Sequence, residues 1–347
     1  MKTTPLPNRA RSAVLASLQA VPFAGDPTWE AQTSSGGVVP NARVSLPVRN
    51  GHFMILVEVK DNGQPRYARE AVTRLLLGLQ RTDADYAVFV APYISPRGAE
   101  ICRENGIGYI DLAGNSYISF DSIFIQKEGK SNPFKRETHL RSLFSPKSER
   151  ILRVLLNSAK ARWKVAELAE EAGVSLGLVS NVKKLLEDQE WLGDGLTLAE
   201  PDALLQAWTQ NYAYTRNEVF SLYSLEEIPE IEARLDAYCR TNAVPFGFTG
   251  FSGAARYAPA VRYRQVMAFV DGEIEALSAD LDLKPVDSGA NVLILSPYDA
   301  GVLYGAAEVD GSQVVSPIQV YLDLVNYRGR GEEAAAAVYE QVLRKRW

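Results

Sequence analysis

The chain has 347 residues, enough for two or three domains, and its 46% hydrophobic and 23% charged residues are ordinary for a globular protein. No apolar run reaches the roughly 18 residues that a membrane-spanning helix needs, so no association with a membrane is expected. Its two cysteines, Cys102 and Cys239, lie far apart without metal-ligand neighbours, so the sequence predicts no zinc site and fits a reducing cytoplasm.

The first part of the chain alternates between strand and helix patterns. A short amphipathic helix is expected over residues 12–21, where Gln19 interrupts the apolar stretch and argues against a signal peptide. The elements that follow are a hairpin, a helix, a strand, a helix, a strand and a final strand with breaks left open, over residues 42–48 and 52–60, 66–81, 86–90, 95–104, 108–112 and 117–126. This order predicts an α/β domain over residues 1–130.

The end of the second hairpin strand reads Val57-Glu58-Val59-Lys60. A Glu-x-Lys at this place resembles the PD-(D/E)xK nuclease fold of restriction endonucleases. The resemblance implies that Glu58 binds a divalent metal, that Lys60 orients the attacking water, and that an Asp on the preceding strand completes the metal site.

The preceding strand, residues 42–48, contains no acid, and Asp26 and Glu30 lie further upstream. A single carboxylate holds Mg²⁺ weakly, so we expect a restriction-endonuclease-like domain that is inactive and carries no cofactor. Two alternatives stay open. Glu58 and Lys60 form a catalytic site with Mg²⁺ or Mn²⁺, or they are only an exposed pair on a sheet edge.

A basic block follows this domain. Between Lys127 and Lys164 there are eleven Lys or Arg against three Glu, a net charge of +8 in a chain whose total is −5. Such a block indicates an anionic partner, most simply a phosphate backbone, although charge runs are also common in solvated linkers. We assign residues 131–145 to a basic linker.

The segment 146–200 has the order of a winged helix-turn-helix. Helices are expected over residues 148–158, 165–172 and 176–186, with Gly173 ending the second helix and Ser175 capping the third. Gly193-Asp194-Gly195 lies between two short apolar runs and predicts a hairpin, the wing.

In this arrangement the third helix enters the DNA major groove. Its expected inner face carries Val179, Val182 and Leu186. Small and polar side chains on the opposite face can approach base edges, and basic side chains can reach phosphates. The predicted DNA-binding residues are Arg162, Lys164, Ser175, Leu176, Gly177, Ser180, Asn181, Lys183 and Lys184.

The remaining residues, 201–347, predict a second α+β domain. A glycine- and serine-rich stretch, Gly250 to Ala255, opens a helix and resembles the start of nucleotidyltransferase-like folds. The next acids, Asp271 and Glu273, come too late for the metal-binding pair of such enzymes, so we interpret the stretch as a packing turn without transferase activity.

Three stretches together resemble the AbiEi-like antitoxins, transcriptional regulators of type IV toxin–antitoxin systems and abortive phage infection. They are the helix-turn-helix, Phe248-Thr-Gly-Phe-Ser-Gly-Ala-Ala255, and Ser316 to Leu324 with residues 328–335. The resemblance covers residues 145–347. It implies repression of the protein's own operon and genetic pairing with a nucleotidyltransferase toxin.

The leading prediction is a non-enzymatic, sequence-specific regulator that binds double-stranded DNA in the cytoplasm. Readers of this kind often bind palindromes as dimers, so a homodimer is part of the expectation. The first alternative is a metal-dependent DNA endonuclease of a defence system that uses Glu58 and Lys60. The second is an interaction protein whose C-terminal domain binds another protein.

Overall fold

The computed structural model describes residues 5–31, 40–49, 51–134 and 143–347. Contacts divide the chain into two compact units, Met1–Glu137 with Glu187–Glu190, and Thr138–Leu186 with Trp191–Trp347. Each unit is built on one mixed sheet with helices, in agreement with the expected α/β class. Over the described residues, no helix is both long and apolar enough to cross a membrane.

The sheet of the first unit has the strand order β1-β2-β3-β4-β5-β6-β7. Its strands are Thr28–Ala31, Ala42–Val48, Gly51–Val59, Tyr86–Ala91, Gly108–Asp111, Ser116–Phe120 and Ile123–Lys127. Strands β3, β4 and β5 are parallel, and the other neighbours pair antiparallel. Its helices are α1, α2 and α3, which span Leu6–Gln19, Pro65–Arg81 and Pro96–Glu104.

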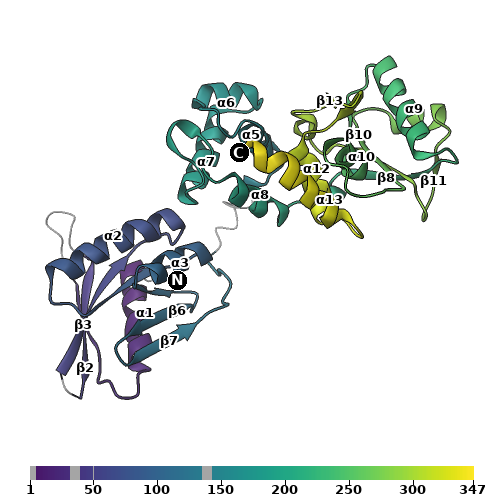
Figure 1. The fold of residues 1–347 in the computed structure, drawn as a ribbon. Coiled ribbons are helices and arrows are strands. Elements are labelled where there is room, and N and C mark those ends of the chain that lie inside the picture. Colours follow the sequence, from purple (N-terminus) through teal and green to yellow (C-terminus); the bar gives the residue numbers. More distant parts are fainter. Residues whose placement is uncertain (1–4, 32–39, 50, 135–142) are drawn as a thin grey trace. The chain divides into compact units, whose positions relative to one another are not determined.

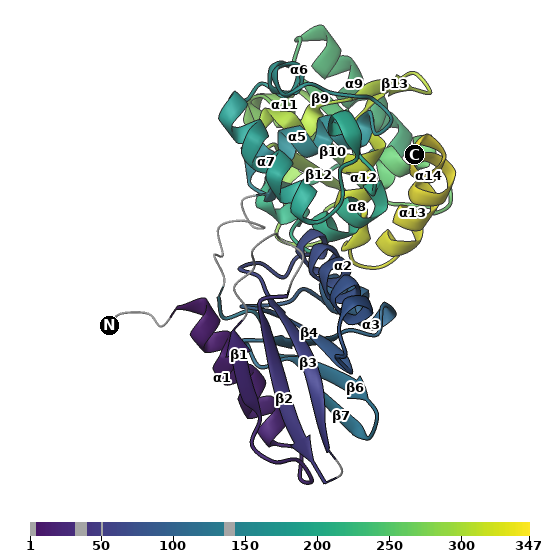
Figure 2. The same cartoon turned by 90° about the vertical axis from the view of Figure 1, so that its left-hand side faces the viewer.

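Helices cover both faces of this sheet, as Figure 2 shows for α1 on one side and for α2 and α3 on the other. Alternate residues of a strand point to opposite faces. On β3, Ile55 and Val57 therefore join the cluster under α1, whereas Leu56 joins the cluster under α2 and α3. Strand β4 is buried along its whole length, as expected for a parallel strand covered on both faces.

The break left open in the last predicted strand is present: Asp121 turns the chain between β6 and β7 with a φ of +46°. Two expectations for the first unit need correction. The first helix begins earlier, at Leu6 instead of residue 12. Glu58 and Lys60 are not an exposed edge pair: β3 lies between β2 and β4, and the Glu58 side chain is fully buried.

The three helices predicted for residues 148–186 are present in the second unit. They are α5, α6 and α7, which span Pro146–Asn157, Val165–Glu171 and Leu176–Asp188. The predicted wing hairpin is much shorter than expected. Trp191 to Ala199 pair through one isolated bridge, Leu192–Leu198, around the 3-10 turn η1, Asp194–Leu196.

A second sheet forms the rest of this unit, with the order β11-β8-β12-β10-β9-β14-β13. Strands β8 to β14 span Glu218–Tyr223, Phe246–Phe248, Val266–Val270, Lys284–Pro285, Val292–Ser296, Ala307–Val309 and Ser312–Val314. Helices α9 (Ile228–Thr241) and α11 (Ile274–Asp280) pack on one face. Helices α10 (Gly250–Tyr257), α12 (Pro317–Val325) and α13 (Gly331–Val338) pack on the other.

The second unit has further elements among its described residues. They are α8 (Pro201–Thr209), the 3-10 turns η2 (Tyr214–Arg216) and η3 (Ala300–Leu303), the π-helical η4 (Tyr339–Leu343) and α14 (Arg344–Arg346).

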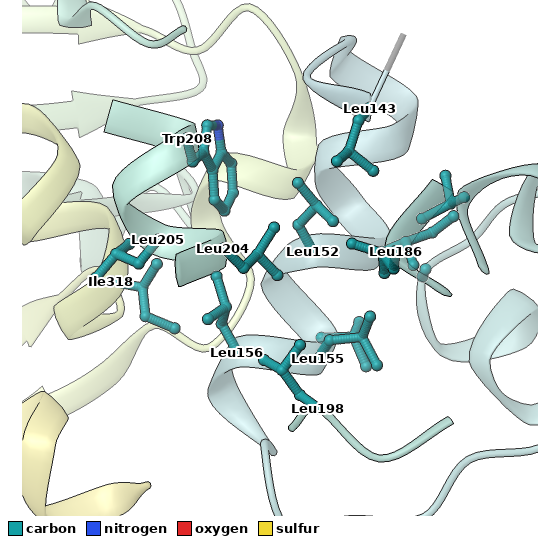
Figure 3. Close-up of a cluster of buried hydrophobic side chains, with 14 of the residues drawn as sticks. Leu143, Leu152, Leu155, Leu156, Leu186, Leu198, Leu204, Leu205, Trp208 and Ile318 are labelled. Atoms are coloured by element: carbon teal, nitrogen blue, oxygen red, sulfur yellow. The ribbon is translucent and has the colours of Figure 1, made fainter. Parts of the chain in front are cut away.

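One hydrophobic cluster joins the three leading helices to the sheet part of this unit. Figure 3 shows Leu152 and Leu155 of α5 beside Leu204 and Trp208 of α8, with Ile318 of α12 on the same cluster. Within this unit α12 thus lies between α5 and the second sheet (Figure 1). The three helices therefore share a core with the C-terminal sheet domain.

Candidate nucleic-acid interface

The inner face of α7 anchors the helix to the second unit. Val179, Val182 and Leu186 are buried, as predicted, in the cluster shared with α5 and α6. Their spacing of three and four residues places them on one side of the helix. This packing fixes which residues of α7 face outward.

The turn before α7 has the predicted chemistry. Gly173 adopts a φ of +61°, a conformation that glycine enters at little cost. The Ser175 hydroxyl accepts a hydrogen bond from the Leu178 amide at 3.3 Å and so caps the helix. Together these two residues set the angle at which α7 leaves α6.

The outer face of α7 is open. Ser175, Leu176, Gly177, Ser180, Asn181 and Lys184 are all exposed. Leu176 exposes 57% of its surface, and a Cβ at Gly177 would meet no atom within 4 Å. Lys183 is half-buried, so it belongs to the flank of the face. The side chains at the centre of this surface are small and those around it are polar, which suits close approach to base edges.

Two further predicted residues flank the short wing. The amide of Trp163 donates to the Gly195 carbonyl at 2.9 Å, and the side chain of Arg162 lies over Gly195. Both Arg162 and Lys164 are exposed, and Lys164 forms a surface ion pair of 3.4 Å with Glu167. An exposed pair of this kind is weak, so Lys164 can exchange Glu167 for a phosphate.

The structure places one further basic residue beside the turn before α7, and the sequence alone did not single it out. Lys147, in the first turn of α5, lines a surface groove with Gly173, Ser175 and Leu178. Glu170 lines the same groove. In the sequence Lys147 is only one member of the basic block. Its position in this groove depends on residues that follow α6 in the chain, which the local pattern around Lys147 does not indicate.

A buried carboxylate joins α5 to the sheet part of this unit. Glu149 is fully buried. It accepts hydrogen bonds from Trp208 Nε1 at 3.2 Å, from Arg216 Nη1 at 2.6 Å and from the Tyr298 hydroxyl. A buried charge is tolerated only when it is paired and hydrogen-bonded, and Glu149 meets both conditions.

The network continues one helical turn later. Arg153, also buried, donates from Nη2 to Gln319 Oε1 at 2.6 Å. The Gln319 amide donates in turn to the Tyr212 hydroxyl at 2.8 Å and to Asp323 Oδ1 at 3.0 Å. Asp323 also accepts from the hydroxyls of Tyr212 and Thr249. The buried polar network thus links α5 to α12 and to the turn before α10.

This network explains two of the stretches on which the family resemblance depends. Thr249 comes from the stretch 248–255, and Gln319 and Asp323 come from the stretch Ser316 to Leu324. Both glycines of the first stretch allow close packing: a Cβ at Gly250 would lie 2.4 Å from Met267 Sδ, and a Cβ at Gly253 would lie 2.9 Å from Val320 Cγ2. The contacts around Gly250 therefore support the packing interpretation of this turn.

Burial raises the pKa of Asp323 to about 6, although hydrogen bonds from Thr249, Tyr212 and Gln319 oppose the rise. Because the folded pKa lies above the ordinary value of 3.8, the unfolded chain releases this proton first as the pH rises. The contribution of protonated Asp323 to the free energy of unfolding is therefore complete below pH 4. It falls between about pH 4 and 6 and stays constant at higher pH. Two pKa units correspond to about 3 kcal/mol of unfolding free energy.

Asp323→Asn is expected to remove this pH dependence, because an amide does not titrate. Urea unfolding of wild type and variant between pH 4 and 7 measures it, and the difference between the two stabilities should change over that range. Asp282→Asn is the matched control, since that exposed carboxylate pairs with Lys284, which lowers its pKa. Parallel stability profiles of wild type and Asp323→Asn would show that Asp323 is ionised throughout.

In the first unit, basic side chains surround the Glu58 carboxylate. Arg74 Nη1 lies 2.9 Å from Glu58 Oε1 and Lys60 Nζ lies 3.7 Å from it, while Lys60 also bonds Glu70 at 2.8 Å. The second oxygen, Glu58 Oε2, is buried without a hydrogen-bond partner. In the parts of the chain that the structure describes, no group of three acidic, histidine or cysteine side chains could hold a metal ion.

Asn41 lies near the position at which the nuclease resemblance implies a metal-binding Asp. It directly precedes β2, one residue beyond the Ala42–Val57 pair, and its Oδ1 accepts from the Val59 amide at 2.6 Å. An amide oxygen without charge binds Mg²⁺ more weakly than a carboxylate. The residues present therefore fit a divalent metal poorly, because Arg74 and Lys60 already neutralise Glu58.

Comparison with known proteins finds a family match in the C-terminal part of the chain. Residues 197–344 match the family described as transcriptional regulator, AbiEi antitoxin, type IV TA system. The AbiEi-like resemblance is thus confirmed over these residues. No curated protein matches the chain at a significant level.

Proposed function

We propose that this chain, whose residues 197–344 match the AbiEi antitoxin regulators, binds double-stranded DNA sequence-specifically and represses its own operon. In this proposal α5, α6, α7 and the short wing form a winged helix-turn-helix, and the protein acts in the cytoplasm without catalysis or a cofactor. The antitoxin role implies a toxin partner, for which the family resemblance suggests a nucleotidyltransferase.

The observation that carries this proposal is the outer face of α7. It leaves Gly177, Ser180 and Asn181 exposed on a helix whose other side is locked into a core. Small residues at the centre allow the helix axis to come close to the groove floor, and Asn181 can pair with the edge of an adenine. Lys184, Arg162 and Lys164 supply positive charge around this face for the phosphates.

The test is a fluorescence-anisotropy titration of the full chain with duplex from its own upstream region, in EDTA, at two salt concentrations. We expect tighter binding than to a scrambled duplex, and affinity that falls steeply with salt. Lys184→Ala should weaken both complexes and reduce the logarithmic salt slope by about one, because one phosphate contact is lost.

Lys284→Ala is the matched control, because Lys284 is an exposed lysine of the C-terminal sheet. It should leave affinity and slope unchanged. Equal affinity for the upstream and scrambled duplexes, or equal effects of the two lysine variants, would contradict the proposal.

A metal-dependent nuclease is the second candidate, and the unpartnered Oε2 of Glu58 is the observation in its favour. Its weakness is the pairing of Glu58 with Arg74 and the neutral Asn41 nearby. We expect the full chain to leave plasmid DNA intact with Mg²⁺ or Mn²⁺.

The same assay with Glu58→Ala and Asn41→Asp decides between the two candidates. Cleavage by the unchanged chain that disappears in Glu58→Ala would establish the nuclease. Asn41→Asp supplies the second carboxylate, so metal-dependent cleavage by this variant alone would show that the fold can be completed to a nuclease but that the natural chain is not one.

A further inference from the structure

A polar groove lies in the first unit, between α1 and the turn that follows β5. Its volume is about 520 Å³. Strands β3, β4 and β5 are parallel, so their carboxyl ends Val59, Ala91 and Asp111 meet at one edge of the sheet. In open α/β sheets this edge is where ligands bind. The groove is thus in a favourable place and of a size typical for small-molecule sites.

The groove has a rigid wall. Asp111 is buried, and its carboxylate accepts hydrogen bonds from the amides of Ile94 at 3.3 Å and Asn115 at 2.8 Å, and from Asn115 Nδ2 at 2.8 Å. Asn115 Oδ1 in turn accepts from the Lys130 amide at 2.8 Å. The charge of Asp111 is therefore directed into the protein, and the turn is held in one conformation.

Two cations face the groove without a carboxylate of their own. Arg9 of α1 and Lys127 of β7 line it, and neither forms an ion pair within the described ranges 5–31, 40–49, 51–134 and 143–347. The guanidinium of Arg9 stacks over the Phe134 ring at 4.8 Å, which positions its plane. Asp111 also lines the groove, but its carboxylate already accepts three amide hydrogen bonds, so the two cations make the groove suited to an anion.

The groove also contains an unsatisfied hydroxyl. Ser116 is 2% exposed, lines the groove, and its Oγ has no hydrogen-bond partner. In β6 it points to the same face as Ile118, which packs in the cluster under α1. A buried polar atom without a partner costs free energy that a ligand can recover.

We propose that this groove binds a phosphate monoester, with Arg9 and Lys127 pairing with the phosphate and Ser116 at the floor. The planar fork of Arg9 matches two phosphate oxygens, and Lys127 adds a point charge. Both a free nucleotide and the 5′-phosphorylated end of a DNA strand carry this group. The site belongs to the first unit, uses none of the α7 residues and does not depend on the proposed regulator function.

The test is isothermal titration of the full chain with AMP, with inorganic phosphate as competitor, followed by a short oligonucleotide with or without a 5′-phosphate. We expect Arg9→Gln to weaken binding at least about tenfold and Lys127→Gln about threefold, because a charge-assisted contact is lost in each. Arg9→Lys should restore part of the affinity. Preference for AMP or for the phosphorylated end identifies the source of the phosphate.

Arg11→Gln is the matched control, since Arg11 is an exposed cation of the same helix that does not line the groove. It should bind as the unchanged chain does, and circular dichroism should show that all variants remain folded. Absence of binding by AMP and by the phosphorylated oligonucleotide would overturn the proposal. Equal losses in Arg9→Gln and Arg11→Gln would overturn it as well, because they indicate non-specific charge attraction.

Discussion

Gly177→Glu is expected to weaken binding of the full chain to its specific duplex at least about a hundredfold. The new side chain would stand at the centre of the exposed face of α7, where a Cβ meets no protein atom within 4 Å. The protein should therefore fold normally. The added bulk would prevent close approach to the base edges, and the added carboxylate would repel the phosphates, which together cost about 3 kcal/mol or more.

Ala276→Glu provides the matched control for this variant. Ala276 is exposed on α11, so the substitution adds the same charge to a helix of the C-terminal sheet domain. Its specific affinity should change by less than about twofold, since long-range charge effects are screened at physiological salt. Full specific affinity in Gly177→Glu would show that α7 is not the reading element.

Glu149→Gln is expected to destabilise the second unit by about 3 kcal/mol. The carboxylate is buried against Arg153 and Arg216, and an amide of the same shape would leave both guanidinium groups without a counter-charge. Breaking a buried pair by removing one partner costs this much because a buried charge is left uncompensated. Urea unfolding followed by tryptophan fluorescence measures it, as Trp208 bonds directly to Glu149.

Glu167→Gln removes an exposed ion pair on α6 and serves as the control. The side chains of Lys164 and Glu167 expose 84% and 51% of their surface, so we expect no measurable change in the urea midpoint. If Glu149→Gln were as stable as this control, the network would contribute specificity of packing but little stability.

The sequence predicted the face of α7 well because that face depends on local patterns. Val179, Val182 and Leu186 recur at helical spacing, and Gly173 and Ser175 mark the turn before the helix. The wing was predicted too long, since Gly195 and Leu196 both take a positive φ and bend the chain after a single bridge. A positive φ is unusual for a leucine, so the sequence pattern does not predict it at Leu196.

The Glu149–Arg153 part of the buried polar network had no signal in the sequence. Glu149 and Arg153, four residues apart, have the spacing of a surface ion pair on a helix. They are buried because α8 and α12 cover them, and these helices begin more than 40 and more than 160 residues later in the chain. Similarly, the sequence shows that residues 42–48 contain no second carboxylate for a site at Glu58. The pairing of Glu58 with Arg74 can be recognised only in the fold.

The most direct test of DNA reading by α7 is selection of duplexes from a random pool by the full chain, by Asn181→Ala and by Lys184→Ala. We predict that the unchanged chain enriches a defined sequence. Asn181→Ala should lose preference at one position of that sequence, whereas Lys184→Ala should keep the sequence and bind all members more weakly. A pool without enrichment, or an identical preference in Asn181→Ala, would contradict sequence reading by this helix.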